Sequence, residues 1–171
     1  MSVDNQNSTE STTMNDADAW IKYPKLRHWY NKLDLSERLG YDCGPAGIPP
    51  DRSDFYVVRP IINLGGMGAG ARIQWIEKGD DRSVPLGHFW CERFNGYHYS
   101  YDLEFVYDFK PDWKTLHCYQ GYHEEGAELY RFSKWIRVER SFNPPHWFHE
   151  LSSVGRINVE CINDKIIEVH L

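Results

Sequence analysis

The stretch INVECINDKIIEVHL, residues 157–171, alternates apolar and polar side chains on both sides of Asn163-Asp164. Alternation with a period of two is the pattern of a β-strand, and two such runs around a turn predict a hairpin. One face of this hairpin is expected to be polar, with Asn158, Glu160, Glu168 and His170. The other face is expected to be apolar, with Ile157, Val159, Cys161, Ile167, Val169 and Leu171.

The predicted register of the hairpin places like charges opposite each other. Glu160 and Glu168 are equally far from Asp164, so a symmetric loop would pair them across the ladder, and Asn158 with His170 likewise. Opposed carboxylates repel, which predicts a positive group between them. One interpretation is a divalent cation: carboxylates suit magnesium, whereas imidazole is more typical of zinc, copper, iron or nickel. The other interpretation is a solvent-facing acidic side of an edge hairpin.

Length and composition bound the class of protein. A chain of 171 residues suits one domain, and we expect a polar, disordered leader over residues 1–16 before a single domain over 17–171. The net charge of −6 argues against nonspecific binding to nucleic acid. Four cysteines without CxxC spacing predict reduced thiols in a cytoplasmic protein, and neither a signal peptide nor a membrane span is recognisable.

The remaining pattern predicts an α+β fold with a mostly antiparallel sheet. Strands are expected over 55–64 and 71–77, then on both sides of a break at Asn95-Gly96, and again within 119–139. A short helix is expected to end at Gly40, and a second one to begin at the prolines of NPPHWFHELSSVG, residues 143–155.

The glycine-rich loop GGMGAG, residues 65–70, lies between two predicted strands. Dinucleotide and Walker fingerprints require a helix after the glycines, so neither applies. A glycine-rich turn between antiparallel strands instead fits a flap whose backbone N–H groups close over a polyphosphate, with Arg59 adding positive charge. A plain hairpin with a glycine-rich tip is the alternative.

These segments, in this order, resemble the ATP-grasp superfamily. VRPIINLGGMGAGA, residues 58–71, looks like its Lys-Pro strand and glycine loop, with Arg59 in the place of the lysine. CERFNGYHYS, residues 91–100, is similar to the hinge motif E-E-F-L-x-G-x-E-x-S at Glu92, Gly96 and Ser100. The hairpin is similar to the family's magnesium-binding strands, with His170 in the place of an asparagine.

The resemblance implies that ATP and Mg²⁺ are the cofactors. Lys32, on a helix similar to one ahead of the ATP site, and Arg59 would contact phosphates, together with the flap residues Gly65, Gly66, Met67, Gly68, Ala69 and Gly70. The hinge residues Glu92, Arg93 and Phe94 would hold the adenine, and His98 stands where the family often has a ribose-binding glutamate. Magnesium would be held by Glu160, Glu168 and His170.

The resemblance also implies an ATP-dependent ligase. Such enzymes activate a carboxylate as an acyl phosphate and pass it to an amine or a related nucleophile. Arg137 or Arg140 would orient the acid, which the motifs do not identify, and a homodimer would let a second copy complete the site. The alternative is a non-catalytic module that binds nucleotide or another protein on the same scaffold.

Transition-metal chemistry is a third hypothesis. Glu160, Glu168 and His170 would then bind zinc or iron. Two other histidine groups are also candidates, His146 with His149 and, separately, His117 with Cys118 and His123. Neither group has the paired spacing of a zinc site, so surface or core-edge histidines are the competing interpretation.

Overall fold

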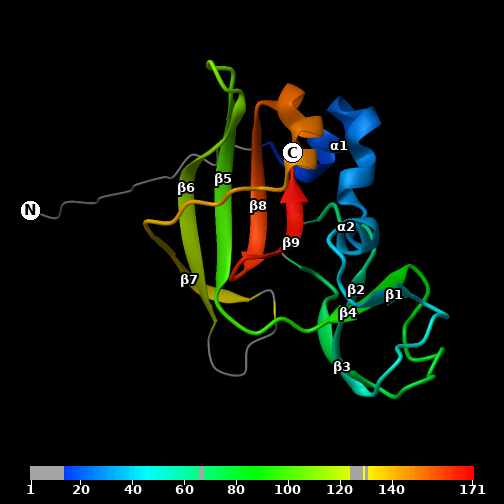
Figure 1. Cartoon of the computed structure of the whole chain (residues 1–171). Coiled ribbons are helices and arrows are strands. Elements are labelled where there is room, and N and C mark those ends of the chain that lie inside the picture. The colour runs from blue at the N-terminus through cyan, green and yellow to red at the C-terminus, as the bar shows by residue number, and fades with distance from the viewer. Residues whose placement is uncertain (1–13, 66–67, 124–128, 130) are drawn as a thin grey trace, which may run out of the picture.

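The structure, a computed structural model, describes residues 14–65, 68–123, 129 and 131–171. Its strands form two antiparallel sheets (Figure 1). The smaller sheet has the order β1-β4-β2-β3 and contains β1 (Cys43–Pro45), β2 (Asp54–Pro60), β3 (Arg72–Ile76) and β4 (His88–Glu92). The larger has the order β7-β6-β5-β8-β9 and contains β5 (His98–Val106), β6 (Asp112–His123), β7 (Phe132–Arg137), β8 (Arg156–Ile162) and β9 (Lys165–His170).

The predicted α+β class with antiparallel strands is confirmed, but the strands form two sheets instead of one. The chain passes from one sheet to the other between β4 and β5, at the predicted break, where Gly96 has φ +145°. The glycine loop joins β2 to β3, as predicted. Strand β6 begins at Asp112, earlier than predicted, because Trp113 already enters the core.

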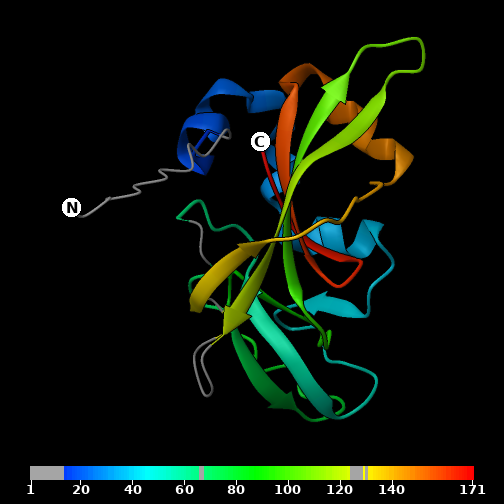
Figure 2. The same ribbon diagram turned by 90° about the vertical axis from the view of Figure 1, so that its left-hand side faces the viewer.

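Helices cover one face of the five-stranded sheet (Figure 2). They are α1 (Asp16–Lys22), the 3-10 helix η1 (Pro24–Tyr30), α2 (Lys32–Arg38) and the 3-10 helix η2 (His146–Val154). The large core lies between them and the sheet, where Tyr101, Phe148 and Val159 are fully buried. Within the described ranges, no helix is both long and apolar enough to span a membrane. The opposite face of the sheet carries polar residues such as Ser100 and Glu160, which pair with each other across β5 and β8.

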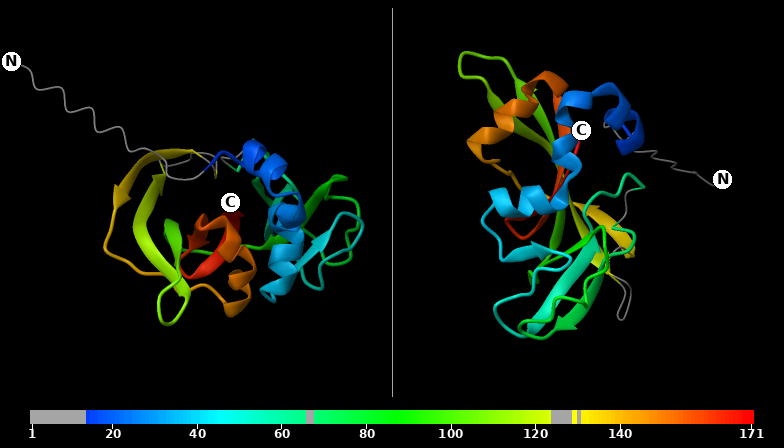
Figure 3. Two further views of the ribbon diagram at one scale, coloured as in Figure 1. Left: turned by 90° about the horizontal axis from the view of Figure 1, so that it is seen from above. Right: turned by 90° about the vertical axis from the view of Figure 1, so that its right-hand side faces the viewer.

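Helix α2 links the two sheets (Figure 3). Its first turn is capped by Asn31, whose side chain accepts a hydrogen bond from the backbone N–H of Asp34 at 3.0 Å. The backbone N–H of Lys32 donates to the carbonyl of Ile61, at 2.9 Å, just after β2. Gly40, in the left-handed region at φ +74°, follows the end of the helix. These contacts fix the helix so that Lys32 is buried between the sheets.

The first described residues include the start of a helix. Asn15 caps α1 by accepting a hydrogen bond from the backbone N–H of Asp18, and Asp16 is buried in the first turn. Residues 1–13 lie outside the described ranges. Residues 14–16, which the sequence assigned to the leader, lie within the described part of the chain, and Asp16 begins α1.

The hairpin of β8 and β9 has the predicted pairs, Glu160 with Glu168 and Asn158 with His170. A β-bulge makes this register possible. Next to the turn, Cys161 pairs with Ile166, and the extra residue Ile167 then shifts the ladder so that Glu160 meets Glu168. The prediction that Ile167 lies on the buried face is wrong, because the bulge puts Ile166 in the core and turns Ile167 toward a pocket.

Candidate functional site

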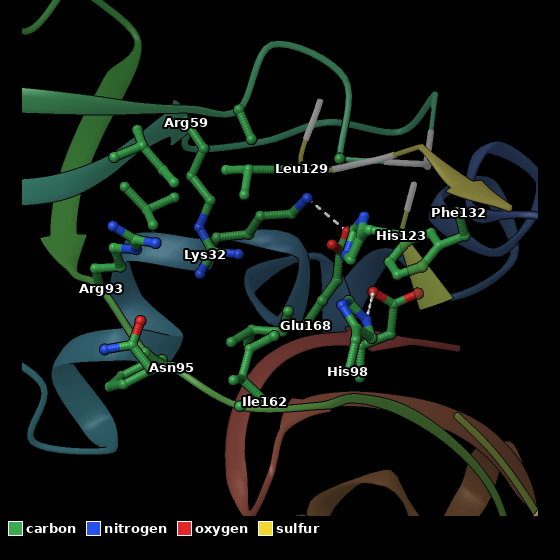
Figure 4. A pocket seen from close by; sticks show the side chains of 18 of the residues that line it. Lys32, Arg59, Arg93, Asn95, His98, His123, Leu129, Phe132, Ile162 and Glu168 are labelled. Atoms are coloured by element: carbon green, nitrogen blue, oxygen red, sulfur yellow. Dashed lines mark hydrogen bonds and ion pairs between the residues drawn. The ribbon is translucent and has the colours of Figure 1, made fainter. Parts of the chain in front are cut away.

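A pocket of about 560 Å³ lies between the two sheets. Its walls come from the inner face of β2 and β3, the glycine loop, the hinge 93–96, α2, and the polar face of the five-stranded sheet. This volume is within the range of small-molecule and cofactor sites. The pocket contains both charged and apolar side chains (Figure 4).

The opposed glutamates lie in this pocket, and basic side chains of the protein itself contact them. The Lys32 Nζ lies 2.5 Å from the Glu168 Oε1, and both side chains are less than a tenth exposed. The His98 Nε2 lies 3.0 Å from the Glu160 Oε2. Figure 4 shows Lys32 reaching across the pocket to Glu168. Part of the positive charge predicted between the glutamates is therefore supplied by Lys32.

His170 completes the cluster of charges. Its Nε2 lies 3.8 Å from the Glu160 Oε1 and 3.9 Å from the Glu168 Oε1, and its Nδ1 lies 2.9 Å from the Asp16 carboxylate. Burial alone would lower the pKa of His170, but the hydrogen bond with Asp16 and the two glutamates raise it well above its ordinary value. Burial would raise the pKa of Glu160, and the imidazoles of His170 and His98 lower it well below its ordinary value.

Two arginines line the same pocket without a carboxylate partner among the described residues. Arg59 comes from β2 and Arg93 from the hinge. The Arg59 Nε is buried and has no hydrogen-bond acceptor within the described ranges, while its guanidinium lies over the Phe89 ring, 5.2 Å from the centroid. A buried donor without an acceptor is costly, so this end of the pocket is suited to an anion.

The hinge is attached to the hairpin turn. The backbone N–H of Tyr97 donates to the Asn163 side chain at 3.1 Å, and the Asn163 side chain donates to the carbonyl of Asn95 at 3.2 Å. Asn163 has φ +52°, the left-handed conformation that asparagine tolerates in turns. A Cβ at Gly96 would collide with Asn163. The backbone of the hinge is thereby held at the edge of the pocket.

Most of the sequence-predicted site residues line the pocket: Lys32, Arg59, Gly68, Ala69, Arg93, Phe94, His98, Glu160 and Glu168. Gly65 and Gly70 lie in the loop without lining it, and Gly66 and Met67 lie outside the described residues. The Glu92 side chain accepts a hydrogen bond from the backbone N–H of Asp42 at 3.1 Å, outside the pocket. His170 is not among the pocket-lining residues, and its Nε2 lies 3.8 Å from the Glu160 Oε1.

The two arginines predicted to orient an acid are not among the pocket-lining residues. Arg137 is exposed and pairs with Tyr119 in a row that continues through Ser100 to Glu160, so it shares their face of the sheet. Arg140 instead donates to the Tyr101 hydroxyl at 3.0 Å and to Asp164 at 2.8 Å. Because Tyr101 points into the core on the opposite face, the position of Arg140 does not support a role in the pocket.

Among the described residues, neither of the alternative histidine groups forms a cluster of three metal-ligating residues. His117 and Cys118 are consecutive on β6, so their side chains point to opposite faces of the sheet. His146 and His149 stack, with centroids 4.5 Å apart, and His149 contacts Asp112. The group of metal-ligating types that does converge in the described part of the chain is Asp16, Glu168 and His170.

Sequence reasoning missed several residues of the site. Asp16 was assigned to the leader, yet it holds His170. Phe132 and Trp135 of β7 also line the pocket, as do Ile162 and Ile167. The acidic first turn of a helix was the available signal for Asp16, but no local pattern links it to a strand more than 150 residues away.

Glu160, Glu168 and His170 are the predicted ligands of a divalent cation. The His170 Nε2 lies 3.8 Å from the Glu160 Oε1 and 3.9 Å from the Glu168 Oε1, whereas the ligand atoms that all lie within 4.8 Å of one another are those of Asp16, Glu168 and His170. Asp16 on the other imidazole nitrogen is the usual partner of a metal-bound histidine. Lys32 occupies the Glu168 Oε1, however. The carboxylates of Glu160 and Glu168 would therefore fit a cation if Lys32 turned away from Glu168.

No protein-family model and no curated protein matches the chain. One solved structure similar to it is that of "a putative ATP-grasp superfamily protein from Archaeoglobus fulgidus". The two chains are 16% identical and superpose with a TM-score of 0.47. The match covers 85% of this chain and 46% of the other, so this chain spans less than half of that protein. The functional assignment rests on the pocket itself.

Proposed function

We propose that the pocket binds ATP. The observation that carries this proposal is the buried Arg59 Nε without an acceptor, in a pocket where Arg93 and Lys32 add two further cationic side chains. A polyphosphate supplies several oxygen acceptors to such a group. The backbone of the glycine loop beside Arg59 can approach phosphates closely, because it has few side chains.

The proposed orientation of ATP follows from the polarity of the walls. The base would lie at the hinge, where Phe94 and Ile162 provide apolar surface beside backbone groups. The phosphates would lie near Arg59 and Lys32. Glu160 and Glu168 would hold Mg²⁺, which when bound neutralises phosphate charge.

For the chemistry, we propose ATP-dependent ligation of a carboxylate to an amine or a related nucleophile. A carboxylate oxygen of the acid attacks the γ-phosphorus, and ADP leaves with the bonding electron pair. The nucleophile then attacks the acyl carbon, loses a proton, and inorganic phosphate leaves. The cationic side chains stabilise the charge that develops on the transferred phosphoryl group, so no side-chain nucleophile is needed.

Calorimetric titration with ATP and ADP, in magnesium and in EDTA, tests the proposal. Wild-type protein should bind both nucleotides. Arg59→Gln should weaken ATP binding by about tenfold or more, as expected for a charge-assisted hydrogen bond worth roughly 1.5–3 kcal/mol. Arg72→Gln is the matched control, since Arg72 is exposed on the strand that follows the same loop and does not line the pocket. Absence of nucleotide binding under all conditions would refute the proposal.

A second candidate is a nucleotide-binding module without turnover. The contacts of Lys32 with Glu168 and of His98 with Glu160 favour it, because groups that would serve a substrate are engaged with each other. Turnover separates the two candidates. A ligase releases ADP and phosphate once acid and nucleophile are supplied, and a binding module releases neither with any acceptor.

A further inference from the structure

Four rings form a continuous surface, here called the aromatic wall, on the side of the pocket away from the hinge. They are His98 of β5, His123 of β6, and Phe132 and Trp135 of β7. Phe132 and Trp135 lie 4.4 Å apart with an interplanar angle of 40°. His98 stands edge-on to both, at 81° and 89°. The wall is thus a packed set of rings.

The backbone beneath the wall leaves room for it. His98, Gly121 and Trp135 pair directly across three strands, so they form one row on one face of the sheet. A Cβ at Gly121 would lie 2.6 Å from the Phe132 ring and 3.0 Å from the Trp135 ring. With glycine at the centre of the row, no side chain separates the two rings from the backbone of the sheet, and both residues line the pocket.

The wall lies beyond the charged centre of the pocket. Figure 4 shows Arg93 and Asn95 of the hinge on one side of Glu168, and His123 and Phe132 on the other. Trp135 keeps 40% of its surface exposed although it lines the pocket. With the base at the hinge and the phosphates in the middle, the wall would face whatever reacts with the nucleotide.

We propose that a substrate other than the nucleotide carries a planar aromatic ring, which packs on the aromatic wall. The inference rests on the proposed function and names a substrate class for it. Ring faces and edges attract one another in offset and edge-to-face geometries. Enclosure of an ammonium group is a poorer fit, because Phe132 and Trp135 contact each other and form one surface instead of a cage.

Matched pairs of small probes test the inference on the full chain, saturated with Mg²⁺ and a non-hydrolysable ATP analogue. Benzoate is compared with cyclohexanecarboxylate, and benzylamine with cyclohexylmethylamine, by ligand-observed NMR titration. Members of a pair share charge and carbon skeleton and differ in ring planarity. In at least one pair the aromatic member should bind more tightly, by between about two- and about tenfold.

Variants of the wall show which residues cause the preference for the aromatic probe. Trp135→Leu should remove it, and Phe132→Leu should reduce it independently. Trp75→Leu is the control, since Trp75 is 47% exposed on β3 and does not line the pocket. Equal affinities within both pairs would overturn the inference. A preference that survives Trp135→Leu would overturn it too. The same holds for a probe that binds only when the nucleotide analogue is left out.

The two proposals fail separately. If calorimetry shows that the analogue binds but the probes show no preference for the aromatic ring, the inference falls and the proposed function stands. If the analogue does not bind, the proposed function falls. A Trp135-dependent preference for aromatic probes would then still assign an aromatic ligand to the wall.

Discussion

The buried pair of Lys32 and Glu168 gives the most direct test of the charge cluster. The atoms are 2.5 Å apart, and the side chains are 6% and 9% exposed. Lys32→Met removes the cation and leaves Glu168 with His170 alone at 3.9 Å. Glu168→Gln keeps the shape of the side chain and leaves the lysine ammonium buried without its partner.

Breaking a buried ion pair from one side costs roughly 3–5 kcal/mol, because a charge is left without compensation. Each single variant should therefore lose about 3 kcal/mol of unfolding free energy. For a chain of this size that corresponds to a fall in Tm of about 6–12 °C. The double variant buries neither charge, so its loss should be well below the sum of the single losses, with a coupling energy of at least about 2 kcal/mol.

The assay is urea unfolding in EDTA, followed by circular dichroism, for the wild type, both single variants and the double variant. Lys114→Met is the control, because its pair with Asp108 spans 3.2 Å but the side chains are 61% and 68% exposed. An exposed pair contributes at most about 1 kcal/mol, so this variant should unfold close to the wild type. Additive losses at Lys32 and Glu168 would refute the assignment of a buried pair.

Three further predictions concern stability. Asp16→Ala should lower the free energy of unfolding by about 1.5–3 kcal/mol, because it removes the charged partner of His170. Asp18→Ala, at an exposed position in the same helical turn, should lower it by less than about 1 kcal/mol. Urea unfolding compares the two variants. Gly96→Ala should lower Tm in thermal unfolding by several degrees, since φ is +145° and a Cβ has no room. Burial raises the pKa of Tyr101 to about 12, against 10 when unfolded, so stability should hold below pH 10 and fall as the pH rises toward 12, less so in Tyr101→Phe.

The sequence predicted those features of the fold that depend on residues close together along the chain. The alternation around Asn163-Asp164 predicted a hairpin with Glu160 opposite Glu168, and the glycines at 65–70 predicted a loop between strands. In both cases the alternation of apolar and polar residues and the preference of Asn, Asp and Gly for turns are enough to predict the local structure.

The sequence could not show the contacts that join distant segments. The bulge at Ile167 depends on which isoleucine the core accepts, and that is decided by packing. Asp16 meets His170 only because α1 docks beside β9, and Arg140 is drawn away from the pocket by Tyr101. Neither the docking of a short helix nor the choice of a hydrogen-bond partner across a sheet produces a periodic pattern in the amino-acid sequence.

The cluster of Lys32, Glu160, Glu168 and His170 has a consequence for the proposed function. In this structure Lys32 neutralises Glu168. If Lys32 turns to a phosphate, Glu168 loses its partner and gains affinity for a divalent cation. Binding of the anion and of the cation would then favour each other, and by thermodynamic reciprocity to the same extent. Opposed carboxylates in one register are tolerable in this fold because Lys32 contacts Glu168 and His98 contacts Glu160, and the same lysine would couple the two ligands if it turned to the phosphate.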